Sequence, residues 1–310
     1  MKKYVFGVDV GGTTVKLGYF TTEGELLDKW EIKTDTSDKG KNILSDIAGS
    51  IKGKISEKNI PAEEIIGCGI GVPGPVDDEG VVYRAVNLGW DIFNLQRELE
   101  EKLGMPVKAA NDANIAALGE QWKGAGEGVP SIVMVTLGTG IGGGIVINGR
   151  VVSGSTGSAG EIGHLHVNDE ETEVCGCGNK GCLEQYGSAT GIARLARRYA
   201  RKNPGASRLA AAEVTAKTVF DGVKERDEDC MAVAEGFGSY LGTGLANVAA
   251  VVNPDMIVIG GGVSKAGEVV VDYVKKYFEE RCFHACRNTR FAIARLGNDA
   301  GIYGAAKLCL

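Results

Sequence analysis

Three cysteines stand close together near the middle of the chain, and their spacing is typical of metal ligands. Cys175, Cys177 and Cys182 fall within eight residues and are interleaved with glycines. His164 and His166 precede them, and either could supply a fourth ligand. One histidine and three cysteines are a familiar ligand set for tetrahedral zinc. Because four protein ligands leave no open position for an activated water, this zinc would be structural.

The alternative for these cysteines is a redox pair. The Cys-x-Cys spacing of Cys175 and Cys177 differs from the Cys-x-x-Cys spacing usual in redox motifs, so the pattern favours zinc. The remaining cysteines are scattered, and isolated thiols of this kind are expected to fill space in the core. They are Cys68, Cys230, Cys282, Cys286 and Cys309.

Three glycine-rich turns, at residues 9–14, 136–140 and 260–264, each follow an apolar run and could bind phosphate groups. Glycine lets backbone amides approach phosphate oxygens closely, and threonine hydroxyls add donors. Neither a Walker loop nor a Rossmann fingerprint fits these turns. Asp9 stands where a carboxylate could hold magnesium, directly or through water. The simpler alternative is that the glycines only form turns and that Asp9 caps one of them.

The elements that must position these residues alternate between strands and helices. Residues 4–10 and 14–20 predict a β-hairpin, and the same pattern returns at 132–137 and 142–147. Aligning Asp9 with Thr136 brings the turns of both copies into register, so we interpret them as a repeated hairpin unit, with chance similarity as the alternative. Helical segments between further apolar strands predict an α/β fold with mixed sheets.

Length and composition narrow the class of protein. The chain has 310 residues, which suggests two domains, and 44% hydrophobic residues allow sizeable cores. A net charge of −6 without basic blocks argues against binding nucleic acid or an anionic membrane. The apolar start is too short for a signal peptide, and no run approaches the ~18 apolar residues of a transmembrane helix. We therefore expect a cytoplasmic protein.

Several motifs, in order along essentially the whole chain, resemble those of the ROK sugar kinases (repressors, open reading frames and kinases), and most closely the family's bacterial glucokinases. They are Asp9-Val10-Gly11-Gly12-Thr13, Gly71-Val72-Pro73-Gly74-Pro75-Val76-Asp77, Asn87-Leu88-Gly89-Trp90, Asn111-Asp112, Gly138-Thr139-Gly140, Glu161-Ile162-Gly163-His164, the three cysteines and Gly260-Gly261-Gly262. The family's repressors carry an N-terminal helix-turn-helix, which is not expected here because the first strand begins within five residues of Met1.

The resemblance implies a two-lobed actin-like (ribonuclease H-like) ATPase fold, with mixed β-sheets flanked by helices. The expected small lobe comprises residues 1–114 and 299–310. The expected large lobe comprises residues 115–298 and includes a zinc-binding loop at 164–182. The implied cofactors are ATP, Mg²⁺ and a structural Zn²⁺, and the implied assembly is a homodimer.

The resemblance also implies a role for each motif residue. Asp112 would be the general base that accepts the proton of the sugar's primary hydroxyl. The implied sugar-binding residues are Gly71, Asn87, Asn111, Asp112, Glu161, His164 and Glu184. The implied residues for ATP and magnesium are Asp9, Gly11, Gly12, Thr13, Thr14, Lys16, Gly138, Thr139, Gly140, Gly260, Gly261 and Gly262. The implied zinc ligands are His164, Cys175, Cys177 and Cys182, so one imidazole would serve both metal and sugar.

Each of these roles has a simpler alternative. Asn111 and Asp112 could only cap the helix that begins at Ala113. Glu161 could be a surface turn residue, and Glu184 a first-turn charge favoured by the helix dipole. The expected activity is ATP-dependent phosphorylation of glucose to glucose 6-phosphate. The alternatives are an N-acetylmannosamine kinase, a fructokinase or another hexose kinase, or a sugar-sensing regulatory protein without catalysis.

Overall fold

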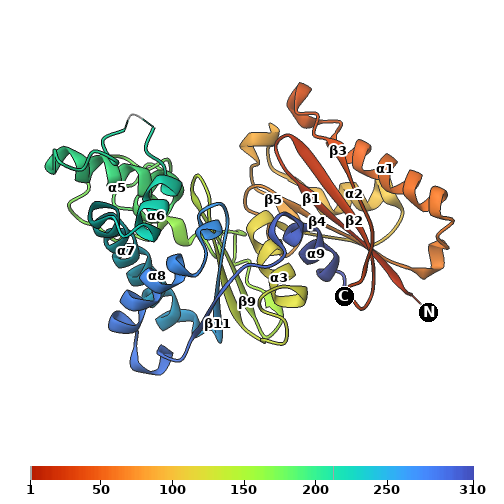
Figure 1. The fold of residues 1–310 in the computed structure, drawn as a ribbon. Coiled ribbons are helices and arrows are strands. Elements are labelled where there is room, and N and C mark those ends of the chain that lie inside the picture. The colour runs from red at the N-terminus through yellow and green to blue at the C-terminus, as the bar shows by residue number, and fades with distance from the viewer. Residues whose placement is uncertain (1, 212) are drawn as a thin grey trace. The chain divides into compact units, whose positions relative to one another are not determined.

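The computed structural model describes residues 2–211 and 213–310, which form two compact units (Figure 1). Unit 1 comprises residues 2–131, 144–160 and 295–310, and unit 2 comprises the described residues of 132–143 and 161–294. These bounds differ from the expected lobes, because residues 115–131, 144–160 and 295–298 group with unit 1. The main reason is the packing of α3 (Asp112–Lys123) against α9 (Ala300–Lys307), where a Cβ added to Gly304 would meet the carbonyl oxygen of Ile115 at 1.6 Å.

Unit 1 is built on a mixed five-stranded sheet in the order β3-β2-β1-β4-β7. Its strands are β1 (Tyr4–Val10), β2 (Thr14–Thr21), β3 (Leu26–Lys33), β4 (Ile65–Val72) and β7 (Val107–Asn111). The first three strands are antiparallel neighbours, whereas β4 runs parallel to both β1 and β7. A short ladder joins β5 (Val81–Val82) to β6 (Phe93–Asn94).

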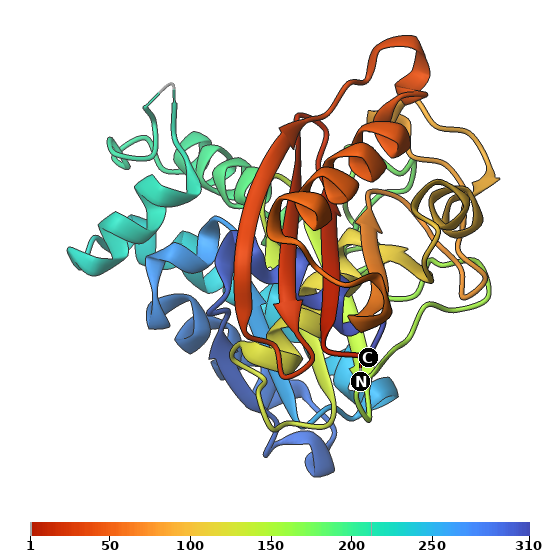
Figure 2. The same ribbon diagram turned by 90° about the vertical axis from the view of Figure 1, so that its right-hand side faces the viewer.

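Helices cover both faces of this sheet because its central strands, β1 and β4, are apolar on both sides. Phe6 and Val8 belong to a buried cluster with residues of α1 (Ile43–Lys58) and α2 (Leu95–Leu103), and Figure 2 shows α1 lying across this face. On the other face, Val5 packs with Ile302 of α9. The sheet is therefore a rigid central layer, and its strand ends have defined positions.

Unit 2 contains most of the second β-sheet. That sheet has the order β10-β9-β8-β11-β12, which matches the order of the first sheet position by position. Its strands are β8 (Ile132–Leu137), β9 (Ile141–Ile147), β10 (Arg150–Val151), β11 (Met256–Gly260) and β12 (Arg290–Ile293), and the chain passes between the units within β9. The matching order confirms the repeated hairpin unit predicted from the sequence.

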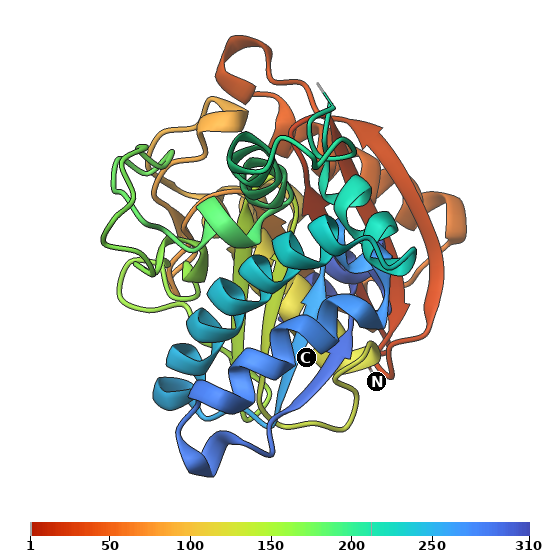
Figure 3. The ribbon, with the colours of Figure 1, turned by 60° about the vertical axis from the view of Figure 1, so that its left-hand side comes forward.

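The helices of unit 2 are α4 (Glu184–Gly187), α5 (Ala189–Lys202), α6 (Ala216–Lys224), α7 (Glu228–Val252) and α8 (Glu268–Arg281). Helices α7 and α8 lie side by side (Figure 3), in close contact at Gly242, where a Cβ would meet the carbonyl oxygen of Val274 at 2.6 Å. Short 3₁₀ turns occur at Ser37–Gly40, Ala62–Glu64, Val86–Leu88, Ile162–His164, Val263–Ala266, His284–Cys286 and Gly297–Asp299. Among the described residues, no helix is long and apolar enough to cross a membrane.

Candidate functional site

In unit 1, several of the predicted site residues lie at one edge of the sheet. The parallel register places Asp9 of β1 opposite Gly71 of β4, and Val72 of β4 opposite Asn111 of β7. The carboxyl ends of these three strands therefore meet at one edge, which is where open α/β sheets commonly bind ligands. The glycine-rich turn that follows Asp9 lies at the same edge.

Asn111 caps helix α3, as the simpler interpretation of this residue predicted. Its Oδ1 accepts hydrogen bonds from the backbone N–H groups of Ala113 and Asn114, at 2.9 and 3.2 Å. Its Nδ2 also donates to the carbonyl oxygen of Gly74 at 3.0 Å, which fixes the 73–75 loop to the start of α3. Asp112 is the first residue of α3, and its Oδ1 accepts from the N–H of Ala113 at 2.8 Å. The Asp112 carboxylate is thus held at the strand edge by the turn itself.

Asp9 is largely buried at this edge. Burial raises the pKa of the Asp9 carboxyl to about 6, and the nearby Asp112 carboxylate contributes to the rise, while Lys16 opposes it. The Asp9 side chain packs against the start of α9, since a Cβ added to Gly301 would lie 2.5 Å from the Asp9 carboxyl carbon. Two carboxylates in one partly buried site favour a cation between or beside them.

The positions of the other predicted residues of unit 1 indicate no specific chemical role. Gly71 has a packing reason of its own, because a Cβ there would lie 1.9 Å from Cδ1 of Ile115 in α3. Asn87 lies in an exposed 3₁₀ turn. Lys16 donates from Nζ to the carbonyl oxygen of Asn298 at 3.0 Å. Gly11, Gly12 and Thr13 are exposed in the turn after β1, where their backbone groups are accessible to a ligand.

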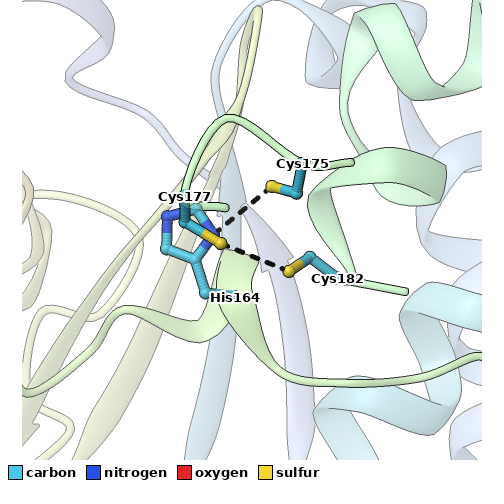
Figure 4. Close-up of side chains that lie close together, drawn as sticks. All are labelled: His164, Cys175, Cys177 and Cys182. Atoms are coloured by element: carbon cyan, nitrogen blue, oxygen red, sulfur yellow. Dashed lines mark hydrogen bonds between the residues drawn. The ribbon is translucent and has the colours of Figure 1, made fainter. Parts of the chain in front are cut away.

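In unit 2, His164, Cys175, Cys177 and Cys182 point toward one another (Figure 4), with one ligand atom of each within 4.8 Å of the others. Sγ of Cys175 lies 3.8 Å from Nδ1 of His164, and Sγ of Cys177 lies 3.6 Å from Sγ of Cys182. His166 lies outside this cluster, because its ring nitrogens contact the carbonyl of Lys180 and the Asp169 carboxylate. His164 is therefore the histidine of the cluster.

The geometry of this cluster fits zinc. A Zn–S bond of about 2.3 Å in a tetrahedron places neighbouring sulfur atoms about 3.8 Å apart, close to the 3.6 Å between Sγ of Cys177 and Sγ of Cys182. Burial raises the pKa of Cys182 to about 12 and also raises that of Cys175, whereas the backbone N–H of Asn179 lowers the pKa of Cys177. A cation would favour the thiolate form of all three, and its binding would release protons.

Two predicted carboxylates flank the cluster. A backbone group holds the Glu184 carboxylate in place, since its Oε2 accepts a hydrogen bond from the N–H of Ile141 at 3.0 Å. Its Oε1 lies 3.7 Å from Sγ of Cys175. Glu161 lies exposed at the start of the 3₁₀ turn that carries His164. The arrangement presents two carboxylates and an imidazole on one segment, which suits recognition of a polyhydroxylated ligand.

The two glycine loops of unit 2 lie beside each other at the ends of adjacent parallel strands. Gly260 of β11 pairs with Thr136 of β8, and a Cβ on Gly261 would meet the backbone of Leu137 at 2.6 Å. The loop at 138–140 is tied to α5, because Ala189 N donates to the Gly138 carbonyl at 2.8 Å. Together, the two glycine loops form one surface that consists mainly of backbone atoms.

A cavity of about 330 Å³ opens next to this surface. The predicted site contained only one of its lining residues, Gly262; it missed Thr215, Lys217, Phe220, Lys224 and Lys265. The lining combines the Phe220 ring with several cations and one carboxylate, Asp221, which pairs with Lys217. The remaining positive charge suits a flat, anionic ligand such as a nucleotide. No motif marks these residues in the sequence, since they come from α6 and the turn after β11 and meet only in the fold.

Known proteins resemble this chain over nearly its full length. A glucokinase from Halalkalibacterium halodurans is 46% identical, covering 97% of this chain and 93% of that protein. A ROK family glucokinase from Streptomyces griseus, solved in complex with glucose and AMPPNP, is 32% identical with a TM-score of 0.73, covering 98% of both chains. A putative xylose repressor from Caldicellulosiruptor is 30% identical, covering 99% of this chain and 78% of that protein.

The family model for the ROK family matches residues 5–310. This match includes the glycine loops and all four residues of the His/Cys cluster described above. The solved relatives have the expected actin-like ATPase fold, and the repeated strand order of the two sheets agrees with it. The chain belongs to the ROK family.

Proposed function

We propose that this protein is a glucokinase that transfers the γ-phosphoryl group of ATP to the primary hydroxyl of glucose. The observation that carries the proposal is the 46% identity to a glucokinase over 97% of the chain. The glucose and ATP analogue bound by the Streptomyces griseus relative support the same pair of substrates. A coupled assay for ADP release with glucose and MgATP tests the proposal directly.

In this proposal, Asp112 accepts the proton of the attacking hydroxyl, and the turn at Asn111 holds its carboxylate in place. Phosphoryl transfer depends chiefly on positioning and charge stabilisation, so a fixed carboxylate and glycine-rich loops are the parts required. Asp9 would hold the magnesium of the nucleotide, which supplies charge neutralisation on the phosphates. The remaining nucleotide-binding residues are Gly11, Gly12, Thr13, Thr14, Lys16, Gly138, Thr139, Gly140, Gly260, Gly261 and Gly262.

The sugar would be recognised chiefly through its hydroxyl groups. The proposed set of sugar-binding residues is Gly71, Asn87, Asn111, Asp112, Glu161, His164 and Glu184. Gly71 is included for its place at the strand edge, where it pairs with Asp9 of β1. With Nδ1 of His164 directed to the metal cluster, Nε2 keeps its proton for a sugar hydroxyl. We also propose, from the family resemblance, that the protein is a homodimer and is located in the cytoplasm.

The first prediction concerns the zinc content of the purified protein. Purified without chelators, the protein should contain one zinc per chain, and Cys182→Ser should reduce this content several-fold, because the buried thiolate is one of four ligands. Elemental analysis of both proteins measures it. His166→Ala is the matched control and should keep its zinc, since His166 lies outside the cluster. Wild-type protein without zinc would contradict the assignment.

The sugar preference is a second prediction. Among glucose, fructose, mannose, N-acetylglucosamine and N-acetylmannosamine, glucose should have the highest kcat/KM, by at least about tenfold. A misplaced hydroxyl or an added acetamido group would leave buried polar groups unpaired, which penalises the other sugars. Steady-state kinetics with MgATP measures the ratio. A larger kcat/KM for an N-acetylhexosamine would point to one of the alternative kinases.

A regulatory protein that binds sugar without phosphorylating it is the alternative from another class. The observation behind this alternative is the 30% identity to a putative xylose repressor. The presence of Asp112 at a fixed position, as the first residue of α3 directly after β7, favours the enzyme. Sugar binding without any ADP release in the coupled assay would support the regulatory role.

A further inference from the structure

Glu171, between His164 and the first metal cysteine, has a side chain with no exposed surface. Its Oε1 accepts hydrogen bonds from Nη2 of Arg198 at 2.8 Å and from the backbone N–H groups of Thr172 and Glu173, both at 2.9 Å. Its Oε2 accepts from the Tyr186 hydroxyl at 2.5 Å and from Nη1 of Arg198 at 3.0 Å. Every lone pair of this carboxylate is therefore engaged.

A second arginine completes the cluster. Arg194 also donates to Oε2 of Glu171 through Nη2. Both arginines contact Glu173 as well, but the Glu173 side chain is 60% exposed. The hydrogen bond from Arg198 holds the pKa of Glu171 well below its usual range, so the carboxylate stays ionised at any working pH. Because the Glu171 carboxylate is buried and fully hydrogen-bonded, it holds the groups that donate to it in fixed positions.

From Glu171, a chain of contacts leads to the metal cluster and to Glu184. The carbonyl of Glu173 accepts from Nε2 of Gln185 at 3.0 Å, and Oε1 of Gln185 accepts from the N–H of Cys182 at 3.1 Å. Arg194 donates through Nη1 to the Gln185 carbonyl at 3.0 Å. Gln185 follows Glu184 directly, so these bonds hold the backbone from which the Glu184 side chain extends.

A second chain of contacts leads through α5 to the glycine loop at 138–140. Arg194 and Arg198 are on α5. At the start of this helix, Ala189 N donates to the Gly138 carbonyl at 2.8 Å, and Oγ1 of Thr190 donates to the Thr139 carbonyl at 2.7 Å. One rigid helix thus has its first residues on the glycine loop and its middle on Glu171.

We propose that Glu171 is a positioning residue that joins the metal loop (residues 165–183) to the glycine loop (residues 138–140) through α5, so that the sugar-binding and phosphate-binding groups of unit 2 keep a fixed separation. The proposal rests on the proposed function for the identity of these two ligands. The coupling of the two loops rests on the contacts alone. Glu171 itself touches neither ligand-binding surface.

The test is Glu171→Gln, which keeps the shape of the side chain but removes its charge. Glu173 still pairs with both arginines, so the variant should fold. We expect KM for glucose and KM for MgATP each to rise about tenfold, because small displacements of positioning groups have effects of this size or larger. Zinc content should stay at the wild-type level, since none of the four ligands is changed.

Two control variants separate positioning from stability. Glu173→Gln removes a carboxylate from the same arginines at an exposed position, and it should leave both KM values within about twofold of wild type. Val274→Ala deletes buried methyl groups in α8 and should lower the melting temperature without changing either KM. If Glu171→Gln loses stability yet keeps wild-type KM values, as Val274→Ala is expected to do, the proposal is wrong.

Hydrogen–deuterium exchange tests the coupling without relying on activity. In Glu171→Gln, peptides covering 165–183 and 136–143 should both exchange faster, whereas in Val274→Ala they should not. Faster exchange confined to 165–183 would overturn the coupling. If wild-type protein fails to phosphorylate glucose, the proposed function fails, but the exchange of these two segments still decides the role of Glu171.

Discussion

Replacing Asp112 with asparagine should lower kcat for glucose phosphorylation about a thousandfold, the size of effect expected for loss of a general base. Asparagine is nearly isosteric, and its Oδ1 can still accept from the N–H of Ala113, so the start of α3 should keep its structure. What is lost is the ability to take the proton of the attacking hydroxyl. Because the side chain keeps its size and shape, glucose and MgATP should bind with nearly wild-type affinity.

The measurement combines steady-state kinetics with calorimetric titration of glucose and a nucleotide analogue. Asp78→Asn is the control, since Asp78 is an exposed carboxylate of the same unit and should retain wild-type kcat. An Asp112→Asn enzyme with more than a tenth of wild-type kcat would show that another group accepts the proton. Loss of glucose binding with kcat preserved would instead make Asp112 a sugar ligand only.

Local sequence signals predicted much of the fold. Alternating β-branched residues and glycine turns have short-range causes, so both hairpin units can be recognised from the residues alone, and the shared strand order of the two sheets confirms them. The cysteine spacing was informative for the same reason, because three ligands within eight residues need little help from the fold. The choice between His164 and His166 depends on the folded loop, since only His164 belongs to the metal cluster.

Features that depend on long-range packing were not predictable. The cavity beside Gly262 is lined by Thr215 and Phe220, which carry no motif and come together only when α6 packs in the fold. Glu171 looks like an ordinary loop carboxylate in the sequence, and its burial becomes evident only with Arg194 and Arg198 in place. The unit boundaries depend on how α3 packs against α9, about 180 residues later in the chain.

Asp9 illustrates how a residue proposed to hold magnesium can reduce stability. Its carboxyl is largely buried beside Asp112, and burial raises its pKa from 3.8 to about 6. Between these two pH values, the folded state holds a proton that the unfolded chain has lost. The free energy of unfolding therefore falls as the pH rises through this window, and the loss is complete above pH 6. About two pKa units correspond to a cost of about 3 kcal/mol at most.

Asp9→Asn should consequently be more stable than wild type at pH 7.5, by up to about 3 kcal/mol, when magnesium and nucleotide are absent. Asparagine has the same size and fits against Gly301 without ionising. At pH below about 3, where the carboxyl is protonated in both states, the two proteins should be equally stable. Denaturant titrations at pH 3 and pH 7.5 measure the difference.

The same substitution should lower kcat/KM for MgATP about a hundredfold, because the group proposed to hold magnesium is lost. Magnesium should raise the melting temperature of nucleotide-bound wild type more than that of Asp9→Asn, since bound cation favours the ionised carboxylate. Asp46→Asn, an exposed carboxylate on α1, is the control and should change neither quantity. A variant that is inactive but less stable than wild type at pH 7.5 would mean that the ionised Asp9 carboxylate stabilises the sheet edge, contrary to its raised pKa.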